Sequence, residues 1–477
     1  MPLIIVDSPP GRAMRDGQSI PPLNIEMSSE ARKIALQILN EVDKRRRTLD
    51  SILADVCAKE TLIRQDRALL NAIVYGVLRW RKCLDHIISH YSKIRLDKIE
   101  PKVLNILRLG IFQIRYLDRI PESAAVNTSV EIAKSVAGPW VAGFVNAILR
   151  NASRSHGNVT FPDFEKDPVS ALSIRKSFPA WLVARWLDRF GIHKTATLCD
   201  TINTIPPISL RTNTIKISRE ILLKTIQTEA TRAEPMAYAP DGICIAEPST
   251  SIPELDAFQK GSFQVQDEAA QLVSLLLNPK PQETVLDACA GLGGKTGHIA
   301  QLMKNQGKII ALDKNAARLK QLEADMHRLG ITIGSTRHQD LYNLSHHQEF
   351  GPFDRILLDA PCSGLGVLRR NPDIKWSSSK QNLKRYYQRQ ATLLELLSPF
   401  LRPSGILVYA VCSTEPEENE AVIETFLKGN KNFGVDTNHG CLPQEVISLM
   451  GSSRYIRTYP DFCDMDGFFM ARLRRVG

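Results

Sequence analysis

The chain has 477 residues, which is too long for one ordinary hydrophobic core, so two or three domains are expected. Apolar residues make up 43% of it and charged residues 23%, as in soluble globular proteins. No stretch approaches about 18 uninterrupted apolar residues, so no membrane-spanning helix is expected.

The first 27 residues are rich in proline and glycine and contain one short apolar run, PLIIV. A signal peptide needs an apolar core of roughly 7–15 residues, so this run does not predict one. We expect residues 1–27 to be a disordered extension, with Met27 as an alternative start.

The nine cysteines are odd in number, and none forms a C-x-x-C pair. This argues against a disulfide framework and against a zinc site, so we expect no metal and a reducing, cytoplasmic setting. Charge is concentrated near the start, because residues 28–155 hold 22 Lys and Arg against 13 Asp and Glu, a net +9 of the chain's +10. Such a basic segment indicates a polyanionic partner, with nucleic acid favoured over a merely solvated basic surface.

Residues 28–155 show apolar side chains at three- and four-residue steps, which predicts an all-α domain of six or seven helices. Residues 156–164 look like a linker, and strands are expected within 208–214 and 237–247 of a small α+β module that extends to residue 260. From residue 261 to the end, strands alternate with helices as a parallel sheet requires. The expected strands of this last domain are TVLDA, KIIAL, TRHQD, RILLDA and GILVYAV, with GFFMARL as an added antiparallel strand.

The segment TVLDACAGLGGKTGHIA has the order strand, glycine turn, helix, which suits close approach of a ligand to the backbone. A phosphate-binding P-loop would need glycine at Cys289, and a dehydrogenase turn would need glycine at Thr296, so both patterns fail. The remaining ligand class is S-adenosylmethionine.

Carboxylates end the strands that follow this turn. Asp313 is placed to bind ribose hydroxyls, Asp340 to reach an adenine amino group, and Asp359 ends the next strand. Each alone reads as a turn residue or helix cap, but together they favour a methyl-donor site.

Two cysteines follow strand ends, Cys362 in LLDAPCSGLG and Cys412 in VYAVCSTEPEENE. If these strands are neighbours, both thiols face the donor site, although two buried structural cysteines would give the same pattern. A thiolate that adds to carbon 6 of cytosine makes carbon 5 nucleophilic, which is covalent catalysis.

The sequence resembles two known protein families. Residues 28–155 resemble the NusB family of RNA-binding helical domains, through ARKIALQIL, YGVLR, ILRLGIFQIRYLD, IPESAAVNTSVEIAK and FVNAILR. The last 220 or so residues resemble the Sun/Fmu family of RNA cytosine-carbon-5 methyltransferases, through FQVQDEAAQL, DACAGLGGKTGH, DAPCSGLGVLRRNPDIKW, VYAVCSTEPEENE and DGFFMARL.

The resemblance implies a Rossmann-like methyltransferase domain and a role for each site residue. The nucleophile is the residue at Cys412, the residue at Cys362 assists release of the product, and Asp359 contacts both the base and the donor. The residues expected to bind the methyl donor are Cys289, Ala290, Gly291, Leu292, Gly293, Gly294, Lys295, Asp313, Asp340 and Asp359. The chain departs from the family at Gly291-Leu292, where the family has alanine and proline, and at Asn371, where histidine is common.

The expected function is therefore methylation of carbon 5 of a cytosine in 16S ribosomal RNA, by a cytoplasmic monomer, before the small subunit is fully assembled. The same reaction on transfer RNA and a catalytically inert RNA-binding assembly or antitermination factor remain as alternatives.

Overall fold

The computed structural model describes residues 29–60, 62–155, 158–343, 350–438, 442–450 and 453–476. The expected disordered extension lies outside these residues. The chain divides into two compact units, one formed by Met1–Thr204 with Asn371–Ser377, the other by Ile205–Arg370 with Ser378–Gly477. Among the described helices, none combines the length and the apolar character that a membrane span needs.

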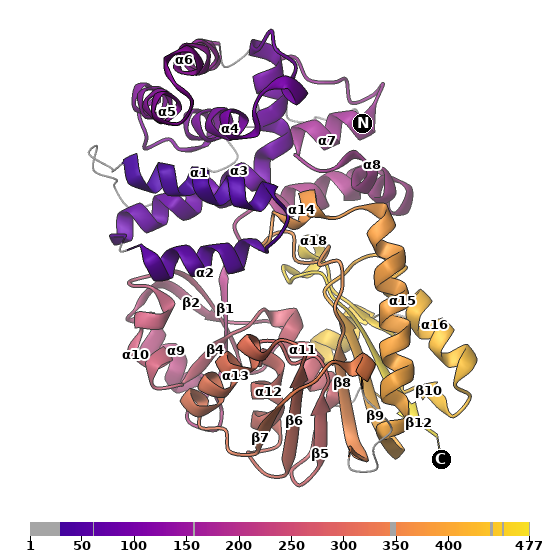
Figure 1. The fold of residues 1–477 in the computed structure, drawn as a ribbon. Coiled ribbons are helices and arrows are strands. Elements are labelled where there is room, and N and C mark those ends of the chain that lie inside the picture. Colours follow the sequence, from indigo (N-terminus) through magenta and orange to yellow (C-terminus); the bar gives the residue numbers. More distant parts are fainter. Residues whose placement is uncertain are drawn as a thin grey trace. The chain divides into compact units, whose positions relative to one another are not determined.

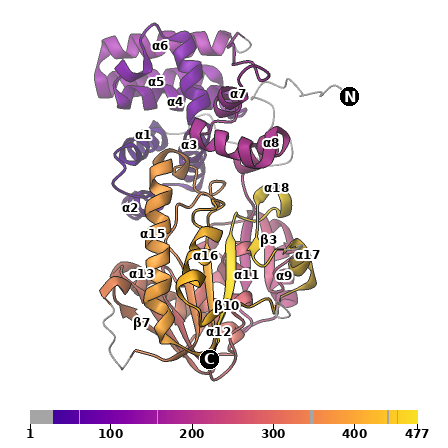
Figure 2. The same ribbon diagram turned by 90° about the vertical axis from the view of Figure 1, so that its right-hand side faces the viewer.

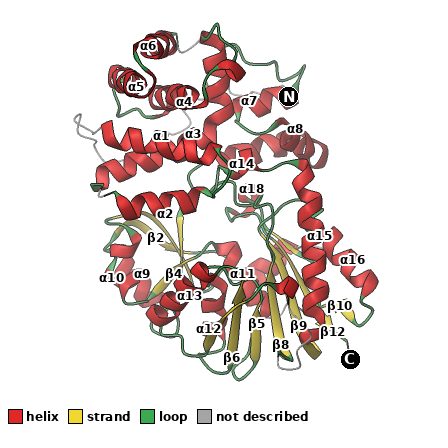
Figure 3. Ribbon diagram, viewed as in Figure 1, coloured by secondary structure: helices red, strands yellow, loops and turns green. Residues whose placement is uncertain are grey.

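The described part of the first unit is helical, as expected for its first segment (Figures 1 and 3). Its main helices are α1 (Ser29–Asp43), α2 (Leu49–Lys59), α3 (Arg64–Tyr91), α4 (Pro101–Tyr116), α5 (Glu122–Ala137), α6 (Pro139–Arg154), α7 (Pro168–Arg175) and α8 (Ala180–Asn203). Proline at the first position of α4, α6 and α7 suits a helix start, where no amide donor is needed. Gly138, at a φ of 88°, ends α5 and allows α6 to begin directly.

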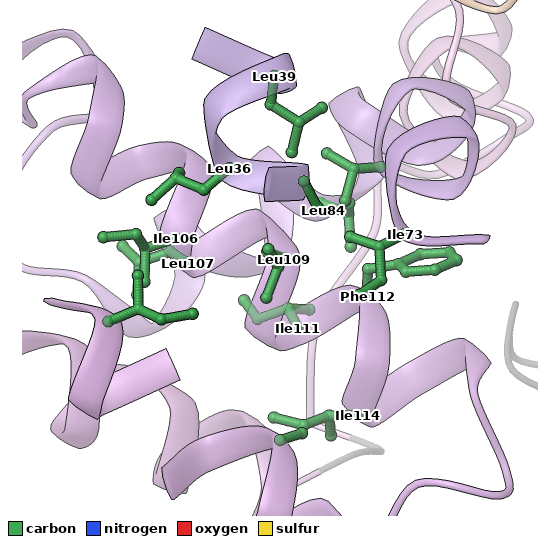
Figure 4. Packing of buried hydrophobic residues seen from close by; sticks show 14 of the residues in the cluster. Leu36, Leu39, Ile73, Leu84, Ile106, Leu107, Leu109, Ile111, Phe112 and Ile114 are labelled. Carbon is green, nitrogen blue, oxygen red and sulfur yellow. The ribbon is translucent and has the colours of Figure 1, made fainter. Parts of the chain in front are cut away.

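Helix α4 is the centre of this unit, because it contacts α1, α3, α5 and α6. Helix α4 therefore buries apolar side chains on several of its own faces, among them Leu107, Leu109 and Ile111 (Figure 4). The helices approach closely at Gly76 of α3, where a Cβ would lie 1.9 Å from the Phe112 ring. Glycine is thus required by packing at this position.

Seven residues far along the chain, Asn371–Ser377, belong to the helical unit and include the short helix α14 (Ile374–Ser377). The Trp376 indole N–H donates to the Leu78 carbonyl at 2.6 Å. Lys375 is fully buried, and its ammonium donates to Asn203 Oδ1 at 2.7 Å. No pattern in these residues predicts that the segment leaves the methyltransferase-like domain.

The second unit contains a four-stranded antiparallel sheet in the order β2-β3-β1-β4. Its strands are β1 (Ile208–Thr212), β2 (Ala230–Pro235), β3 (Gly242–Pro248) and β4 (Phe263–Val265). Helix α9 (Arg219–Gln227) packs against β2 and β3. The strands β1 and β3 lie where the sequence predicts them, whereas β2 and β4 were not expected.

The larger sheet has the order β10-β12-β9-β8-β5-β6-β7 (Figure 1), in which β10 is Phe433–Val435, and the short β11 (Ile456–Arg457) pairs with β12. Five strands are parallel, namely β5 (Thr284–Asp287), β6 (Lys308–Asp313), β7 (Gly334–His338), β8 (Phe353–Asp359) and β9 (Leu401–Val411). Strand β12 (Phe469–Arg475) pairs antiparallel with β9, as predicted. The expected parallel sheet and its added antiparallel strand β12 are therefore confirmed, whereas β10 and β11, which pair with β12, were not expected.

Both faces of this sheet are covered, so the middle of its central strands carries apolar residues on both faces. In β8, Leu357 packs on the face of α11 (Glu268–Leu277) and α12 (Gly294–Leu302), while Ile356 and Leu358 pack on the opposite face. That opposite face carries α15 (Lys380–Leu397) and α16 (Glu420–Gly429), which stand before the sheet in Figure 2.

Candidate active site

The candidate site lies at the carboxyl ends of the parallel strands. Asp287 ends β5, Asp313 ends β6 and Asp359 ends β8, and Asp340 follows the end of β7 by two residues. Because β7, β6, β5 and β8 are consecutive neighbours, these four carboxylates come from one edge of the sheet. From β5 the chain adds β6 and β7 on one side and then β8 on the other side. The strand order thus reverses between β5 and β8, which is where open α/β sheets bind ligands.

The turn after β5 is shaped by two glycines in the left-handed region, Gly291 at a φ of 57° and Gly293 at 83°. Gly293 also has no room for a side chain, since a Cβ there would lie 2.5 Å from Leu322. At Gly291 a Cβ would meet no atom within 4 Å, so its backbone faces open space. The turn thus exposes main chain at Gly291 and packs against α13 (Ala316–Leu329) at Gly293.

Asp313 connects this turn to the next strand. One carboxylate oxygen accepts the Gly291 N–H at 3.0 Å, and the other accepts the Asn315 N–H at 2.8 Å. Asp340 also accepts a local amide, that of Tyr342, at 3.1 Å. Both aspartates therefore order backbone in the ligand-free chain, as the turn and cap interpretation predicts, and both remain at the edge that the donor-site interpretation requires.

Asp287 was not singled out from the sequence, yet it is the most buried carboxylate of the edge, with 1% of its surface exposed. Thr296 donates its hydroxyl to one carboxylate oxygen at 2.7 Å, and the other oxygen has no hydrogen-bond partner among the described residues. Burial raises the pKa of Asp287 to about 7, and the charges of Asp359 and Asp313 act in the same direction. The position of this carboxylate at a strand end was the available signal.

Lys295 is the cation of the site. Its ammonium lies 2.6 Å from Asp359 Oδ2, and the two side chains are only 14% and 28% exposed. Burial lowers the pKa of Lys295, but Asp359 and Cys412 outweigh it, and the net pKa is raised. The Lys295 ammonium therefore stays charged next to Asp359.

The two cysteines meet. Cys362 follows β8 and Cys412 follows β9, and their sulfur atoms lie 3.2 Å apart. The strands are held in register up to this point by the Ala360 N–H, which donates to the Ala410 carbonyl at 2.9 Å. The hydrogen bond to Cys412, followed by burial, raises the pKa of the Cys362 thiol well above its ordinary value. The Cys362 thiol thus keeps its proton.

Arg211 of β1 is a further residue that sequence reasoning missed. It is fully buried, and its guanidinium donates to the Gly294 carbonyl at 2.5 Å, to Gln301 Oε1 at 2.7 Å and to Gln266. Burial lowers the pKa of Arg211 to about 9. The small sheet is thereby joined to the first turn of α12, next to the donor turn.

The remaining predicted residues lie in the same turn. Cys289, partly buried, packs against the apolar cluster on the α15 face, and burial raises its thiol pKa. The Ala290 carbonyl accepts the Gly293 N–H at 2.9 Å, and Leu292 is 57% exposed. All seven cysteines whose side chains are described are free thiols.

Three family models match consecutive parts of the chain. Residues 29–154 match the NusB family, residues 178–252 the ferredoxin-like domain of RsmF/B-like methyltransferases, and residues 274–474 the 16S rRNA methyltransferases RsmB/F. A probable ribosomal RNA small subunit methyltransferase B of Bacillus subtilis is 36% identical over 451 residues, which cover 94% of this chain and 99% of that protein.

The chain belongs to the RsmB/F family. A second relative with the same name, from Synechocystis, is 35% identical over 447 residues, with 94% and 99% of the two chains covered. The family membership makes the chain a ribosomal RNA methyltransferase, and it confirms the NusB-like domain and the α/β methyltransferase domain expected from the sequence.

Solved structures agree with this assignment to the RsmB/F family. The crystal structure of PH0851 superposes with a TM-score of 0.78 at 26% identity and covers 96% of this chain and 100% of its own. A methyltransferase homolog from Pyrococcus horikoshii gives a TM-score of 0.54 at 30% identity and covers 64% of this chain and 97% of its own.

Proposed function

We propose that the chain transfers a methyl group from S-adenosylmethionine to carbon 5 of a cytosine in 16S ribosomal RNA. The observation that carries this proposal is the pair of thiols, Cys362 and Cys412, at the ends of adjacent strands beside the donor turn. Transfer to a nitrogen or oxygen would need no covalent adduct, whereas carbon 5 of cytosine needs activation by a nucleophile.

The residues of the turn suit a cationic methyl donor. Asp359 and Asp313 both act electrostatically on Asp287, and Lys295 is a cationic neighbour. Carboxylates gathered at one edge of the sheet favour a positively charged ligand, and S-adenosylmethionine carries a sulfonium and an ammonium group. The open space at Gly291 leaves its backbone accessible to such a ligand.

The donor would be held by the turn Cys289–Lys295, with Asp313 at the ribose hydroxyls and Asp340 at the adenine amino group. Asp359 would contact both the donor and the base. When bound, S-adenosylmethionine supplies the methyl group as an electrophile.

Cys412 carries the covalent step. Its thiolate forms a bond to carbon 6 of the cytosine, and the electron pair of the 5,6 double bond makes carbon 5 nucleophilic. Lys295 interacts electrostatically with Cys412. In the free enzyme the Cys362 thiol is placed to share its proton with this sulfur.

Cys362 serves the release of the product. After methyl transfer, carbon 5 carries both the methyl group and a proton. Loss of that proton restores the double bond, the bond between sulfur and carbon 6 breaks, and Cys412 is freed. Cys362, next to Cys412, assists this elimination.

The substrate is ribosomal RNA before the small subunit is complete, and the enzyme acts as a cytoplasmic monomer. The helical segment 28–155, with its net charge of +9, contributes contacts to the RNA phosphates. A buried cytosine has to leave its stack to reach the thiols, which is easiest in unfinished particles.

Tritium release tests the proposal. RNA that carries tritium at carbon 5 of cytosine is incubated with the protein and S-adenosylmethionine. We expect tritium release equal to methyl transfer, confined to 16S RNA and abolished in Cys412→Ala. Methylation without tritium release would place the methyl group on another atom.

A further inference from the structure

Glu418, in the loop between β9 and α16, is a fully buried carboxylate that the reaction above does not use. It accepts four hydrogen bonds. One oxygen accepts the Ser363 N–H at 2.8 Å and the Gln390 amide at 3.0 Å. The other accepts the Ser413 hydroxyl at 2.7 Å and the Ser363 hydroxyl. Every donor is neutral, and burial raises the pKa of Glu418.

The two serines directly follow the two active-site cysteines, and their turns repeat one design. The Ser363 hydroxyl accepts the Leu365 N–H at 3.4 Å, and the Ser413 hydroxyl accepts the Glu415 N–H at 3.3 Å. The two hydroxyls lie 3.2 Å apart. One carboxylate therefore joins two equivalent turns that come from different strands.

The regular pairing of β8 and β9 ends just before the cysteines, at the Ala360–Ala410 hydrogen bond. The next backbone link between the two segments is the Gly366 N–H, which donates to the Cys412 carbonyl at 3.0 Å. Between these two links, the Ser363 N–H is bonded to the Glu418 side chain. Glu418 is itself fixed to β9, since the Tyr409 hydroxyl donates to the Glu418 carbonyl at 2.6 Å. Its four acceptor positions then fix the Ser363 turn relative to the Ser413 turn.

We propose that Glu418 is a positioning residue that holds Cys362 and Cys412 in the mutual arrangement that the reaction requires. The roles of the two thiols rest on the proposed function, whereas the effect on their separation does not. Glu418 acts through Ser363 and Ser413 and touches neither sulfur.

Replacement of Glu418 by glutamine keeps the size of the side chain and changes its hydrogen bonding. An amide has one acceptor oxygen and one donor nitrogen, whereas the four partners of Glu418 all donate. At least two of the four bonds must break or reverse. The buried donors that lose their acceptor then favour a rearranged turn.

The test measures the separation of the thiols directly, with phenylarsine oxide as the probe. Trivalent arsenic bonds to two sulfurs only where they lie close together, as Cys362 and Cys412 do, and releases water. The Cys362→Ser/Cys412→Ser variant gives the background from the other cysteines. Glu424→Gln, the same substitution at an exposed position of α16, is the matched control.

We expect wild type and Glu424→Gln to capture one arsenical per chain above background. In Glu418→Gln, capture should weaken at least tenfold, and the rate of a single methylation turnover should fall at least tenfold with the KM for the donor within twofold. Capture by Glu418→Gln within twofold of Glu424→Gln would overturn the proposal.

Ser413→Ala provides a second variant, because it removes one hydroxyl of the joint and leaves the carboxylate in place. It should weaken capture by a smaller factor than Glu418→Gln, and it carries the test if Glu418→Gln does not fold. Ser413→Ala with wild-type capture would then overturn the proposal. If arsenical capture is weakened in these variants but the wild type releases no tritium, the proposed reaction is wrong. The positioning role of Glu418 is then still supported.

Discussion

The sulfur atoms of Cys362 and Cys412 lie 3.2 Å apart, although 50 residues separate them in the chain. The raised pKa of Cys362 leaves the proton on that residue. Under the proposed function, Cys412 is the sulfur that attacks and Cys362 is the one that keeps its proton.

Cys362→Ala should trap the enzyme on its RNA. The variant still adds Cys412 to carbon 6 and accepts the methyl group, but the elimination that frees Cys412 is slowed. Because the bond between sulfur and RNA is covalent, the complex should survive a denaturing gel in the presence of S-adenosylmethionine. It should disappear in Cys362→Ala/Cys412→Ala.

Two further variants are to be run on the same denaturing gel. Cys412→Ala should form no adduct and lose methylation by several decades, since a covalent nucleophile is removed. Cys463→Ala, at a buried cysteine near the end of the chain, is the matched control and should behave as wild type. An adduct in Cys412→Ala but not in Cys362→Ala would reverse the two roles.

Asp313→Asn should weaken the binding of S-adenosylmethionine with little effect on RNA. The carboxylate accepts the Gly291 N–H, and we propose that it also meets the ribose hydroxyls of the donor. Loss of charge-assisted hydrogen bonds costs about 1.5–3 kcal/mol, which corresponds to a Kd roughly tenfold to a hundredfold higher. Calorimetric titration with donor and filter binding with RNA give the two affinities, and equal weakening of both would contradict the ribose role.

Asp287→Asn should remove a pH dependence of stability. Since burial raises the Asp287 pKa from 3.8 to about 7, its folded form holds the proton more tightly than the unfolded chain does. Stability is then highest below pH 3.8 and is lost as the pH rises through 7, by about 4 kcal/mol in total. We expect the free energy of unfolding of wild type to fall by roughly 2–3 kcal/mol relative to that of Asp287→Asn when the pH rises from 5 to 8. Denaturant unfolding of both proteins at the two pH values, without added ligand, measures this change. A constant difference would mean that Asp287 is ionised throughout.

Sequence reasoning located the site because its residues stand at strand ends. Once RILLDA and GILVYAV are recognised as neighbouring parallel strands, the residues that follow them must meet at one edge, and Cys362 and Cys412 do. The same rule placed Asp313 and Asp359. Local pattern and a topological rule were sufficient for these four residues.

Residues whose partners are distant in the chain could not be found in this way. Arg211 lies in a strand that reads as an ordinary apolar one, and its role depends on Gly294, 83 residues later. Glu418 gives no pattern that distinguishes it from its acidic neighbours, since what sets it apart is its hydrogen bond to Ser363, 55 residues earlier in the chain. The segment 371–377 reads as part of a methyltransferase motif, whereas its contacts belong to the helical unit.

Arg45→Glu/Arg46→Glu should weaken RNA binding and flatten its salt dependence. Both side chains are exposed in the basic turn after α1. Each phosphate contact that is lost should lower the slope of log affinity against log salt by about 0.7–0.9. The matched control is Lys304→Glu/Lys308→Glu, which makes the same charge change at the amino-terminal edge of the sheet. Equal slopes for the two variants would show that the α1 turn does not contact RNA.

Lys375→Ala should destabilise the helical unit far more than an ordinary surface change. The ammonium is fully buried, lies 3.6 Å from the centre of the Phe178 ring and donates to Asn203 Oδ1 and to the Ser177 carbonyl. Burial lowers the pKa of Lys375 well below its ordinary value, so the charge is costly, but its loss leaves buried acceptors without this donor and opens a cavity. We expect a loss of about 3–5 kcal/mol in denaturant unfolding. Lys380→Ala, five residues later and exposed, should stay within about 0.5 kcal/mol of wild type. If the two variants unfold alike, Asn371–Ser377 is not anchored in the helical unit through Lys375.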